Sequence, residues 1–339
     1  MQRKMLYPEL VFIDVTPHCN LKCKHCYSKD VVAPKETSLL EIKHLIKEIS
    51  EQVISFDIVG REPFMHKNII DIISYAKKHR LVVNIATNAT LIDEKVAKKL
   101  KQLKVNQIQV SIDHSNKNIH NDFRRSDCFD KIIRGIKYLV KQNIEVVVCT
   151  TLTNFNCDDI ENIINLIYPL GVKHYRIKTL ICDENSKQYQ VNKTQYKSVV
   201  KKMWDLRNKY PGLYIHQMHH SFLFSKDKKY FPNKEIAIPC GACINRISIT
   251  ADRKMTPCIA ISHLYNADFI SFNDTWQNSL MIKNWTRVFK NIKGKCSYCG
   301  YRYFCGGGCR AAVYGITGDI TSSDPFCWYN PKGVKHEIK

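Results

Sequence analysis

Three closely spaced cysteines near the N-terminus form the first group of residues whose type and spacing suggest a chemistry. The group consists of Cys19, Cys23 and Cys26, in a C-x3-C-x2-C pattern. It follows residues 10–15, an apolar run that predicts a β-strand, and parallel α/β folds bind ligands at that end of a strand. Three thiolates can hold three irons of a cubane cluster and leave the fourth iron open. A closed zinc site would need a fourth ligand, for which His18 and His25 are available.

A second and denser group of cysteines lies near the C-terminus, where residues 240–339 hold eight of the 15 cysteines. The eight are Cys240, Cys243, Cys258, Cys296, Cys299, Cys305, Cys309 and Cys327. In a cytosolic protein such clustering indicates metal ligands rather than disulfides. The spacing by itself does not separate zinc sites from iron–sulfur clusters.

The elements that must position these cysteines alternate regularly from residue 10 to residue 209. Short apolar runs, typical of strands, are separated by longer stretches with the helical period. Six such repeats predict parallel strands with right-handed crossovers, and therefore an α/β fold built on a partial (β/α)6 barrel. The predicted strands are 10–15, 55–59, 81–86, 107–113, 144–151 and 174–181, and the predicted helices are 38–52, 68–79, 93–103, 129–142, 158–168 and 194–209.

Two of the predicted strands carry polar side chains on one face. The polar residues are Gln109, Ser111 and Asp113 on one strand and His174, Arg176 and Lys178 on the other. Buried parallel strands are normally apolar along their whole length. The pattern therefore favours a wet, ligand-holding barrel interior, although an edge strand that faces solvent would give the same alternation.

The composition changes along the chain and indicates two domains. We expect a barrel over residues 1–209, a linker over 210–236 and a small cysteine-rich domain over 237–339. No apolar run reaches the roughly 18 residues of a membrane span, and the N-terminus does not resemble a signal peptide, so we expect a cytoplasmic location without membrane contact. The formal net charge of +21 favours anionic partners, but scattered lysines that solvate helix surfaces explain it equally well.

The first cysteine motif resembles the signature of radical S-adenosylmethionine (SAM) enzymes. The resemblance implies that Cys19, Cys23 and Cys26 hold a [4Fe–4S] cluster whose open iron binds SAM, and that an anaerobic enzyme uses the resulting 5′-deoxyadenosyl radical to abstract hydrogen from a substrate. An electron donor such as flavodoxin or ferredoxin is implied as well.

Further segments resemble the SAM-binding motifs of that family, in the expected order. Gly60-Arg-Glu-Pro63 stands where the family has Gly-Gly-Glu-Pro, so Arg61 is a departure, and Glu62 is expected to accept the SAM ammonium. His25 is expected against the adenine, and Arg124 near the SAM carboxylate. The remaining positions implied to lie around SAM are Gly60, Asn88, Ser111, Asp113 and Asn154, with Asn156 as the alternative to Asn154.

The C-terminal cysteines resemble the SPASM extension of radical SAM enzymes, which carries two auxiliary [4Fe–4S] clusters. The resemblance implies that Cys240, Cys243, Cys258 and Cys309 hold one cluster, and that Cys296, Cys299, Cys305 and Cys327 hold the other. Cys243 is the ligand whose spacing varies in that family. Of the four cysteines left over, Cys182 has the parity of the polar strand face, and we hypothesise that its thiol donates a hydrogen atom to a substrate radical.

Enzymes with this two-part layout mostly modify peptides. We therefore expect a maturase of a ribosomally made precursor peptide, which installs a thioether or carbon–carbon crosslink or epimerises a residue. The first strand begins near residue 10, so we expect direct binding of the peptide, with an acidic leader, or a separate leader-recognition protein. The alternatives are a formylglycine-generating or small-molecule radical SAM enzyme, and a zinc-stapled basic protein that binds nucleic acid.

Overall fold

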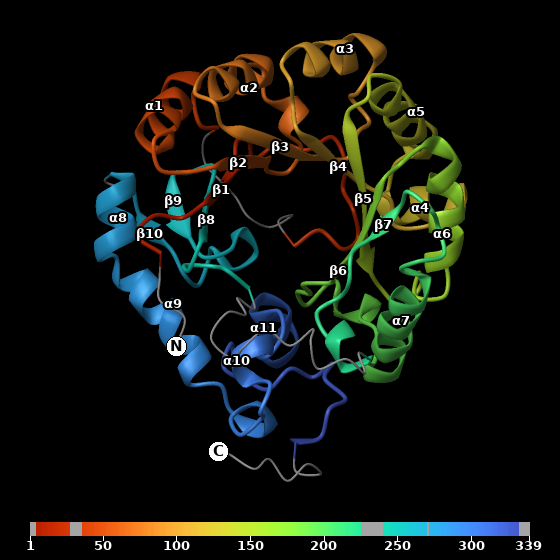
Figure 1. Ribbon diagram of the computed structural model, residues 1–339, viewed down its shortest axis with the longest axis vertical. Coiled ribbons are helices and arrows are strands. Elements are labelled where there is room, and N and C mark those ends of the chain that lie inside the picture. The colour runs from red at the N-terminus through yellow and green to blue at the C-terminus, as the bar shows by residue number, and fades with distance from the viewer. Residues whose placement is uncertain (1–4, 28–35, 225–239, 270, 332–339) are drawn as a thin grey trace.

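One curved sheet of ten strands organises the molecule, with strand order β10-β9-β8-β1-β2-β3-β4-β5-β6-β7 (Figure 1). This computed structural model describes residues 5–27, 36–224, 240–269 and 271–331. The strands form the inner layer in Figure 1 and the helices between them lie outside. The six central strands are β1 (Leu10–Asp14), β2 (Ser55–Val59), β3 (Val82–Thr87), β4 (Gln107–Ser111), β5 (Glu145–Leu152) and β6 (His174–Thr179), all parallel.

The helices that cover the sheet lie where the apolar period predicts them, with shorter ends. They are α1 (Leu39–Ile49), α2 (Ile69–Lys78), α3 (Glu94–Gln102), α5 (Phe129–Lys141), α6 (Ile160–Ile167) and α7 (Lys193–Leu206). Helix α1 starts at a capping box, in which Ser38 and Glu41 bond each other's backbone amides. Helix α4 (Lys117–Arg124) was not predicted, because its sequence KNIHNDFR is short and largely polar. The predicted α/β fold with a partial barrel is confirmed.

The alternation of side chains separates two faces of the sheet. On β3, Val83 and Ile85 are fully buried in the core beneath the helices, whereas Asn84 faces the opposite way. We call this opposite face the concave face. Asn84 there donates hydrogen bonds to Asp57 (2.9 Å) and Ser55 (3.3 Å), both on β2. The concave face is therefore polar on more strands than the two that the sequence singled out.

The C-terminal region continues the same sheet across the predicted domain boundary. Strand β8 (Arg246–Ile249) pairs in parallel with β1, with Leu10 opposite Arg246, and β9 (Lys254–Thr256) and β10 (Ala267–Asp268) extend it antiparallel. The predicted linker contributes β7 (Tyr214–Ile215), which pairs with β6, while 225–236 lie outside the described residues. The remaining C-terminal helices are α8 (Phe272–Asn278), α9 (Leu280–Lys290), α10 (Arg302–Cys305) and α11 (Arg310–Thr317).

Helices α10 and α11 lie on the side of the molecule opposite β2 and β3, where they face the concave side of the sheet (Figure 1). Within the described ranges, no helix is long and apolar enough to cross a membrane.

Candidate functional site

The first cysteine motif forms a loop at the carboxyl end of β1 and lines a pocket of about 540 Å³. The loop is anchored by a backbone hydrogen bond from Lys24 to the carbonyl of Phe123, at the end of α4 (3.0 Å). All three cysteines are half-buried. The lining consists of Cys19, Leu21, Lys22, Cys23, Lys24, Cys26, Arg61, Arg125, Asn185, Gln188 and Tyr189. The structure thus brings the three predicted cluster ligands together at one accessible, cationic pocket.

A buried ion pair lies directly behind this loop. The guanidinium of Arg124, on α4, is 2.6 Å from a carboxylate oxygen of Asp113 and donates to the sulfur of Cys23 at 3.5 Å. Burial opposes ionisation of Asp113, but Arg124, His25, His120 and the amide of Thr151 together outweigh it and hold the pKa of this carboxyl below its usual value. Arg124 also favours the thiolate of Cys23, although burial leaves the pKa of that thiol raised. The two residues contact each other, and their expected places near SAM, Asp113 at the ribose and Arg124 at the carboxylate, stay predictions.

His25 lies between two of the cysteines and stacks on the ring of Phe123, with 4.8 Å between ring centroids and 3° between planes. Its Nε2 is 3.7 Å from Asp113. Burial lowers the pKa of His25 to about 4, so the imidazole is neutral at pH 7. A neutral, stacked ring is suited to pack against another flat aromatic group, and the contact of His25 with adenine stays a prediction.

Glu62 is fully buried and organises the turn after β3. One carboxylate oxygen accepts hydrogen bonds from the hydroxyl of Thr87 (2.6 Å) and the amide of Phe64 (3.1 Å), and the other accepts from the amide of Asn88 (2.7 Å). Asn88 in turn reaches the first motif, where its side-chain amide donates to Asn20 (2.9 Å). Glu62 therefore holds the segment that contains Asn88 against the cysteine loop, and its predicted contact with the SAM ammonium remains a prediction.

The glycine of the Gly60-Arg61-Glu62 segment is required by its surroundings. Gly60 has φ +139°, and a Cβ there would lie 2.6 Å from a carboxylate oxygen of Asp14. Arg61, the departure from the family pattern, lines the pocket together with the cysteines. Asp14 is a partly buried carboxyl that the sequence did not single out, and desolvation raises its pKa to about 7.

Of the two asparagines after β5, the structure places Asn156 deeper than Asn154. Asn156 is fully buried and donates to the carbonyls of Asp113 and Thr151, both at 2.9 Å. Asn154 is exposed and donates to the carbonyl of Gln188, a residue that lines the pocket. Asn156 therefore fixes the position of Asp113, and neither asparagine has a demonstrated role toward SAM.

The concave face also carries cations and a thiol. Strand register puts Ser111, Cys149 and Arg176 side by side on β4, β5 and β6. The thiol of Cys149 is 3.4 Å from the side-chain oxygen of Gln109, and Arg176 approaches Nδ1 of His216 at 3.4 Å. Arg176 on β6 and Arg246 on β8 both act electrostatically on the buried Asp57. The sequence signal that could have revealed this cluster is Asp57, a charged residue within the otherwise apolar strand 55–59.

Cys182, the hypothesised hydrogen-atom donor, is buried beyond the end of β6. Its backbone packs so closely on α11 that a Cβ at Gly315 would lie 2.4 Å from the Cys182 carbonyl oxygen. It does not line the pocket at the first cysteine motif. Its role stays a hypothesis.

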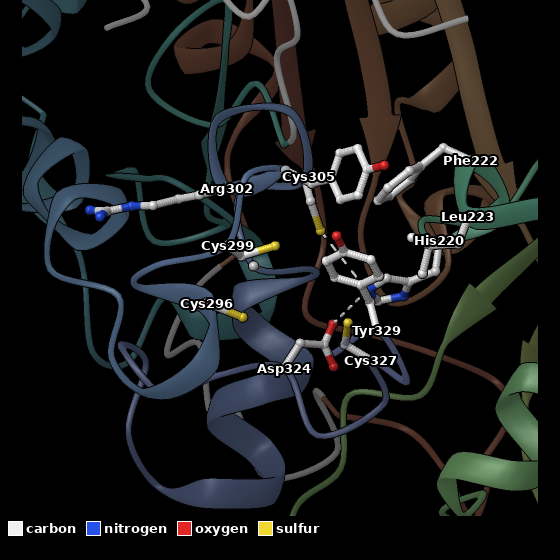
Figure 2. A pocket seen from close by; sticks show the side chains of 12 residues that line it. His220, Phe222, Leu223, Cys296, Cys299, Arg302, Cys305, Asp324, Cys327 and Tyr329 are labelled. Atoms are coloured by element: carbon white, nitrogen blue, oxygen red, sulfur yellow. Dashed lines mark hydrogen bonds and ion pairs between the residues drawn. The ribbon is translucent and has the colours of Figure 1, made fainter. Parts of the chain in front are cut away.

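One of the two C-terminal cysteine sets lines a single pocket (Figure 2). It contains Cys296, Cys299, Cys305 and Cys327, the four residues that the resemblance assigned to one cluster. Asp324 and His220 lie at its edge, with 3.6 Å between the imidazole Nε2 and the carboxylate, and the same nitrogen is 3.9 Å from the sulfur of Cys305. Burial lowers the pKa of His220 to about 3, so this imidazole is neutral.

The other set gathers around Arg246, whose guanidinium donates to the sulfur of Cys240 at 3.2 Å. Cys240, Cys258 and Cys309 all favour the charged form of this arginine, and they disfavour one another's thiolates. Cys243 is completely buried and has φ +56°, and its assignment as the fourth ligand stays a prediction.

The donor sets fit iron–sulfur clusters. Four cysteines around one cavity, and three around another with an arginine on a sulfur, supply the thiolates and the compensating charge that such clusters require. Among the described residues, no group of three or more histidine, cysteine, aspartate or glutamate side chains is arranged to hold a single metal ion.

Comparison with known proteins places these features in context. The family model for the radical SAM superfamily matches residues 13–167. The AdoMet-dependent heme synthase of Methanosarcina barkeri is 27% identical over 341 residues, which cover 96% of this chain and 97% of that protein.

Two solved structures share the fold over nearly the whole chain. Streptococcus suis SuiB bound to its precursor peptide SuiA aligns with a TM-score of 0.78 at 16% identity, over 95% of this chain and 76% of that one. The enzyme anSMEcpe with bound AdoMet and the Kp18Cys peptide aligns with a TM-score of 0.77 at 18% identity, over 94% of both chains.

Proposed function

Because the chain is a radical SAM enzyme, we propose that it is a peptide maturase which abstracts hydrogen from a precursor peptide bound at the concave face of its sheet. The observation that carries the proposal is the fold. The alignment with the peptide-bound anSMEcpe leaves only a few per cent of either chain unmatched, and it includes the cysteine-rich C-terminal region. The same alignment and the match to the radical SAM family favour an enzyme over the alternative of a zinc-stapled nucleic-acid-binding protein.

The first site would hold a [4Fe–4S] cluster through Cys19, Cys23 and Cys26, and with SAM bound that cluster supplies a 5′-deoxyadenosyl radical that abstracts hydrogen. The protein contributes orientation and charge. Arg124 donates to Cys23 and compensates its negative charge, while Asp113 fixes the guanidinium. The stack of His25 on Phe123 offers a flat, neutral surface for the adenine.

The C-terminal cysteines would hold two auxiliary [4Fe–4S] clusters, with Cys243 as the proposed fourth ligand of the one near Arg246. Around SAM we further propose Gly60, Glu62, Asn88, Ser111 and Asn154, and we propose Cys182 as the hydrogen donor. Partners are proposed on the same basis: an acidic leader segment or a separate leader-recognition protein, and a flavodoxin- or ferredoxin-type electron donor.

The charge of the concave face supports an anionic substrate. Arg176 and Arg246 project onto it. Asp57, a carboxyl on which both arginines act, has its pKa raised by burial and therefore a reduced tendency to ionise. An acidic peptide satisfies this field without a specific motif.

A second candidate substrate is a carboxylate-bearing tetrapyrrole. It is favoured by the match to a heme synthase, which covers 96% of this chain and 97% of that protein. Because the match is nearly complete on both sides, neither protein has a large domain that the other lacks. The propionate groups of an iron porphyrin would meet the same arginines. The peptide remains our first proposal because the fold matches enzymes solved with peptides bound.

The test is anaerobic reconstitution with iron and sulfide, followed by metal analysis and by incubation with SAM and dithionite. We expect about 12 irons per chain, as for three cubanes, and formation of 5′-deoxyadenosine. Acidic precursor peptides encoded beside this protein and an iron coproporphyrin are then offered separately, and products are identified by mass spectrometry. A mass change in a peptide supports the first candidate, and loss of carboxyl groups from the porphyrin supports the second. Iron uptake without any cleavage of SAM would refute the proposal.

A further inference from the structure

Arg310 is a completely buried cation whose hydrogen-bonding capacity the described residues do not fill. It follows Cys309 and begins α11, and its side chain is 1% exposed. Its Nη1 donates to the carbonyls of Ile320 (3.0 Å) and Ser322 (2.8 Å), whereas Nε and Nη2 have no hydrogen-bond partner in the described part of the chain. Buried donors are almost always satisfied, and a buried charge is costly unless it is compensated. An acceptor of a different kind is therefore required.

The charged groups around Arg310 belong to both C-terminal cysteine sets. They are Asp324, Cys296, Cys309 and Cys305, each of which favours the charged guanidinium. Cys296, Cys305 and Asp324 line the pocket in Figure 2, while Cys309 belongs to the set around Arg246. The guanidinium thus acts on both proposed cluster sites.

The glycine run between Cys305 and Cys309 brings the backbone onto this cation. A Cβ at Gly307 would lie 2.9 Å from Nη2 of Arg310, and a Cβ at Gly308 would lie 1.7 Å from a carboxylate oxygen of Asp324. Both glycines have positive φ, +71° and +82°. Only glycine permits this approach, so the run holds the loop between two ligand cysteines against the unfilled side of the guanidinium.

We propose that Arg310 donates its Nε–H and Nη2–H groups to sulfurs of the auxiliary [4Fe–4S] clusters and thereby raises their reduction potentials. The inference rests on the proposed function, in which these cysteines hold clusters. A cluster gains one negative charge when it is reduced, and a fixed buried cation stabilises that charge. Charge and hydrogen bonds to sulfur are among the factors that set cluster potentials. Arg310 thus acts through the clusters, by setting their reduction potentials, and is not a catalytic residue.

The experiment is a potentiometric titration of the reconstituted full-length protein, followed by electron paramagnetic resonance. The signal of the SAM-binding cluster is identified because addition of SAM changes it. In Arg310→Gln, we expect at least one auxiliary midpoint to become more negative, so that the ratio of reduced to oxidised cluster at a fixed potential falls about tenfold, which is 59 mV for one electron. Arg310→Lys keeps the positive charge but loses the planar guanidinium. Its auxiliary midpoint potential should therefore lie between those of the wild type and of Arg310→Gln.

Arg287→Gln is the control. Arg287 is exposed in the last turn of α9 and does not line this pocket, so its loss removes one surface charge that solvent screens and should leave the midpoints unchanged. Unchanged auxiliary midpoints in both Arg310 variants, at full iron content, would overturn the inference. A wild-type protein that binds only about four irons would instead refute the auxiliary clusters themselves, so the two failures are distinguishable.

Discussion

At the scale of single residues, the most informative feature is the pairing of Asp113 with Arg124. The sequence placed both near SAM, one at the ribose and one at the carboxylate. In the structure their charges are 2.6 Å apart and buried, and the free side of the guanidinium reaches Cys23. Both residues therefore act on the first site through its electrostatics, from behind the cysteine loop.

Replacing Arg124 with glutamine should destabilise the protein strongly. The change leaves the carboxylate of Asp113 buried without its cation, and breaking a buried pair in this way typically costs about 3–5 kcal/mol. Urea unfolding measures the loss. Lys117→Gln breaks the exposed pair with Asp130 and should cost far less, because solvent screens both charges. Equal losses in the two variants would show that the buried pair has no special importance.

Asp14 should make stability depend on pH. Its folded-state pKa, about 7, lies above the ordinary value of 3.8 because burial disfavours the charged form, outweighing Arg61 and the amide of Thr16. The native state therefore binds the proton more tightly than the unfolded state. The contribution to stability is complete below pH 4 and is lost as the pH rises through 7.

Asp14→Asn removes this dependence, so the variant should gain stability relative to the wild type between pH 5 and pH 8. Urea unfolding at both values measures the difference. The control is Asp71→Asn, which changes an exposed carboxyl on α2. A difference between Asp14→Asn and the wild type that is the same at both pH values would contradict the assigned pKa.

At the scale of elements, the strands expose their polar faces to the site and the helices carry close contacts that only glycine allows. Gly315, inside α11, packs on the backbone of Cys182 beyond β6. This contact joins the C-terminal region to the barrel at a point that no periodicity in the sequence marks.

Gly315→Ala has two opposite effects on stability, a gain in helix propensity and a clash with the backbone of Cys182, and its measurement shows which is larger. Alanine in an open helix position would stabilise by about 1 kcal/mol. Here its Cβ would lie 2.4 Å from a carbonyl oxygen, so we expect a loss of about 1–3 kcal/mol instead, measured by denaturant unfolding. A gain in stability would show that the two backbones are not in contact.

The polar face of β6 should determine affinity for an anionic substrate. Arg176→Gln removes a cation from the concave face, and since a charge-assisted hydrogen bond contributes about 1.5–3 kcal/mol, we expect KM to rise roughly tenfold or more. Lys173→Gln, an exposed lysine just before the same strand, should leave KM unchanged. An equal effect of both variants would mean that only the overall charge matters.

At the scale of the whole molecule, the barrel and the cysteine-rich region form one sheet. Parallel pairing of β8 with β1 covers an edge that the first 209 residues alone would expose. Open strand edges are sites of aggregation, so a chain that ends at Lys209 should be aggregated or unfolded.

The full chain should accordingly unfold in one transition. Tryptophan fluorescence reports mainly the C-terminal region, which holds Trp276, Trp285 and Trp328, whereas circular dichroism reports mainly the helices of the barrel. The two denaturation curves should coincide. Two separated transitions would mean that the parts fold independently, as the sequence suggested.

The sequence by itself determined the six strand–helix repeats of the barrel, the clustering of the cysteines and the polar faces of β4 and β6. These features are local: spacing, periodicity and alternation follow from backbone geometry within one element. It also predicted the grouping of Cys296, Cys299, Cys305 and Cys327, through the resemblance to known enzymes, and the pocket contains these four.

Only the tertiary structure decided which groups meet. The pairing of Asp113 with Arg124, the depth of Asn156, the burial of Asp14, the contact of Gly315 with Cys182 and the unfilled donors of Arg310 each join segments far apart in the chain or depend on burial. Electrostatic energies depend on distance and on exclusion of water, and neither quantity is contained in a linear pattern of residues.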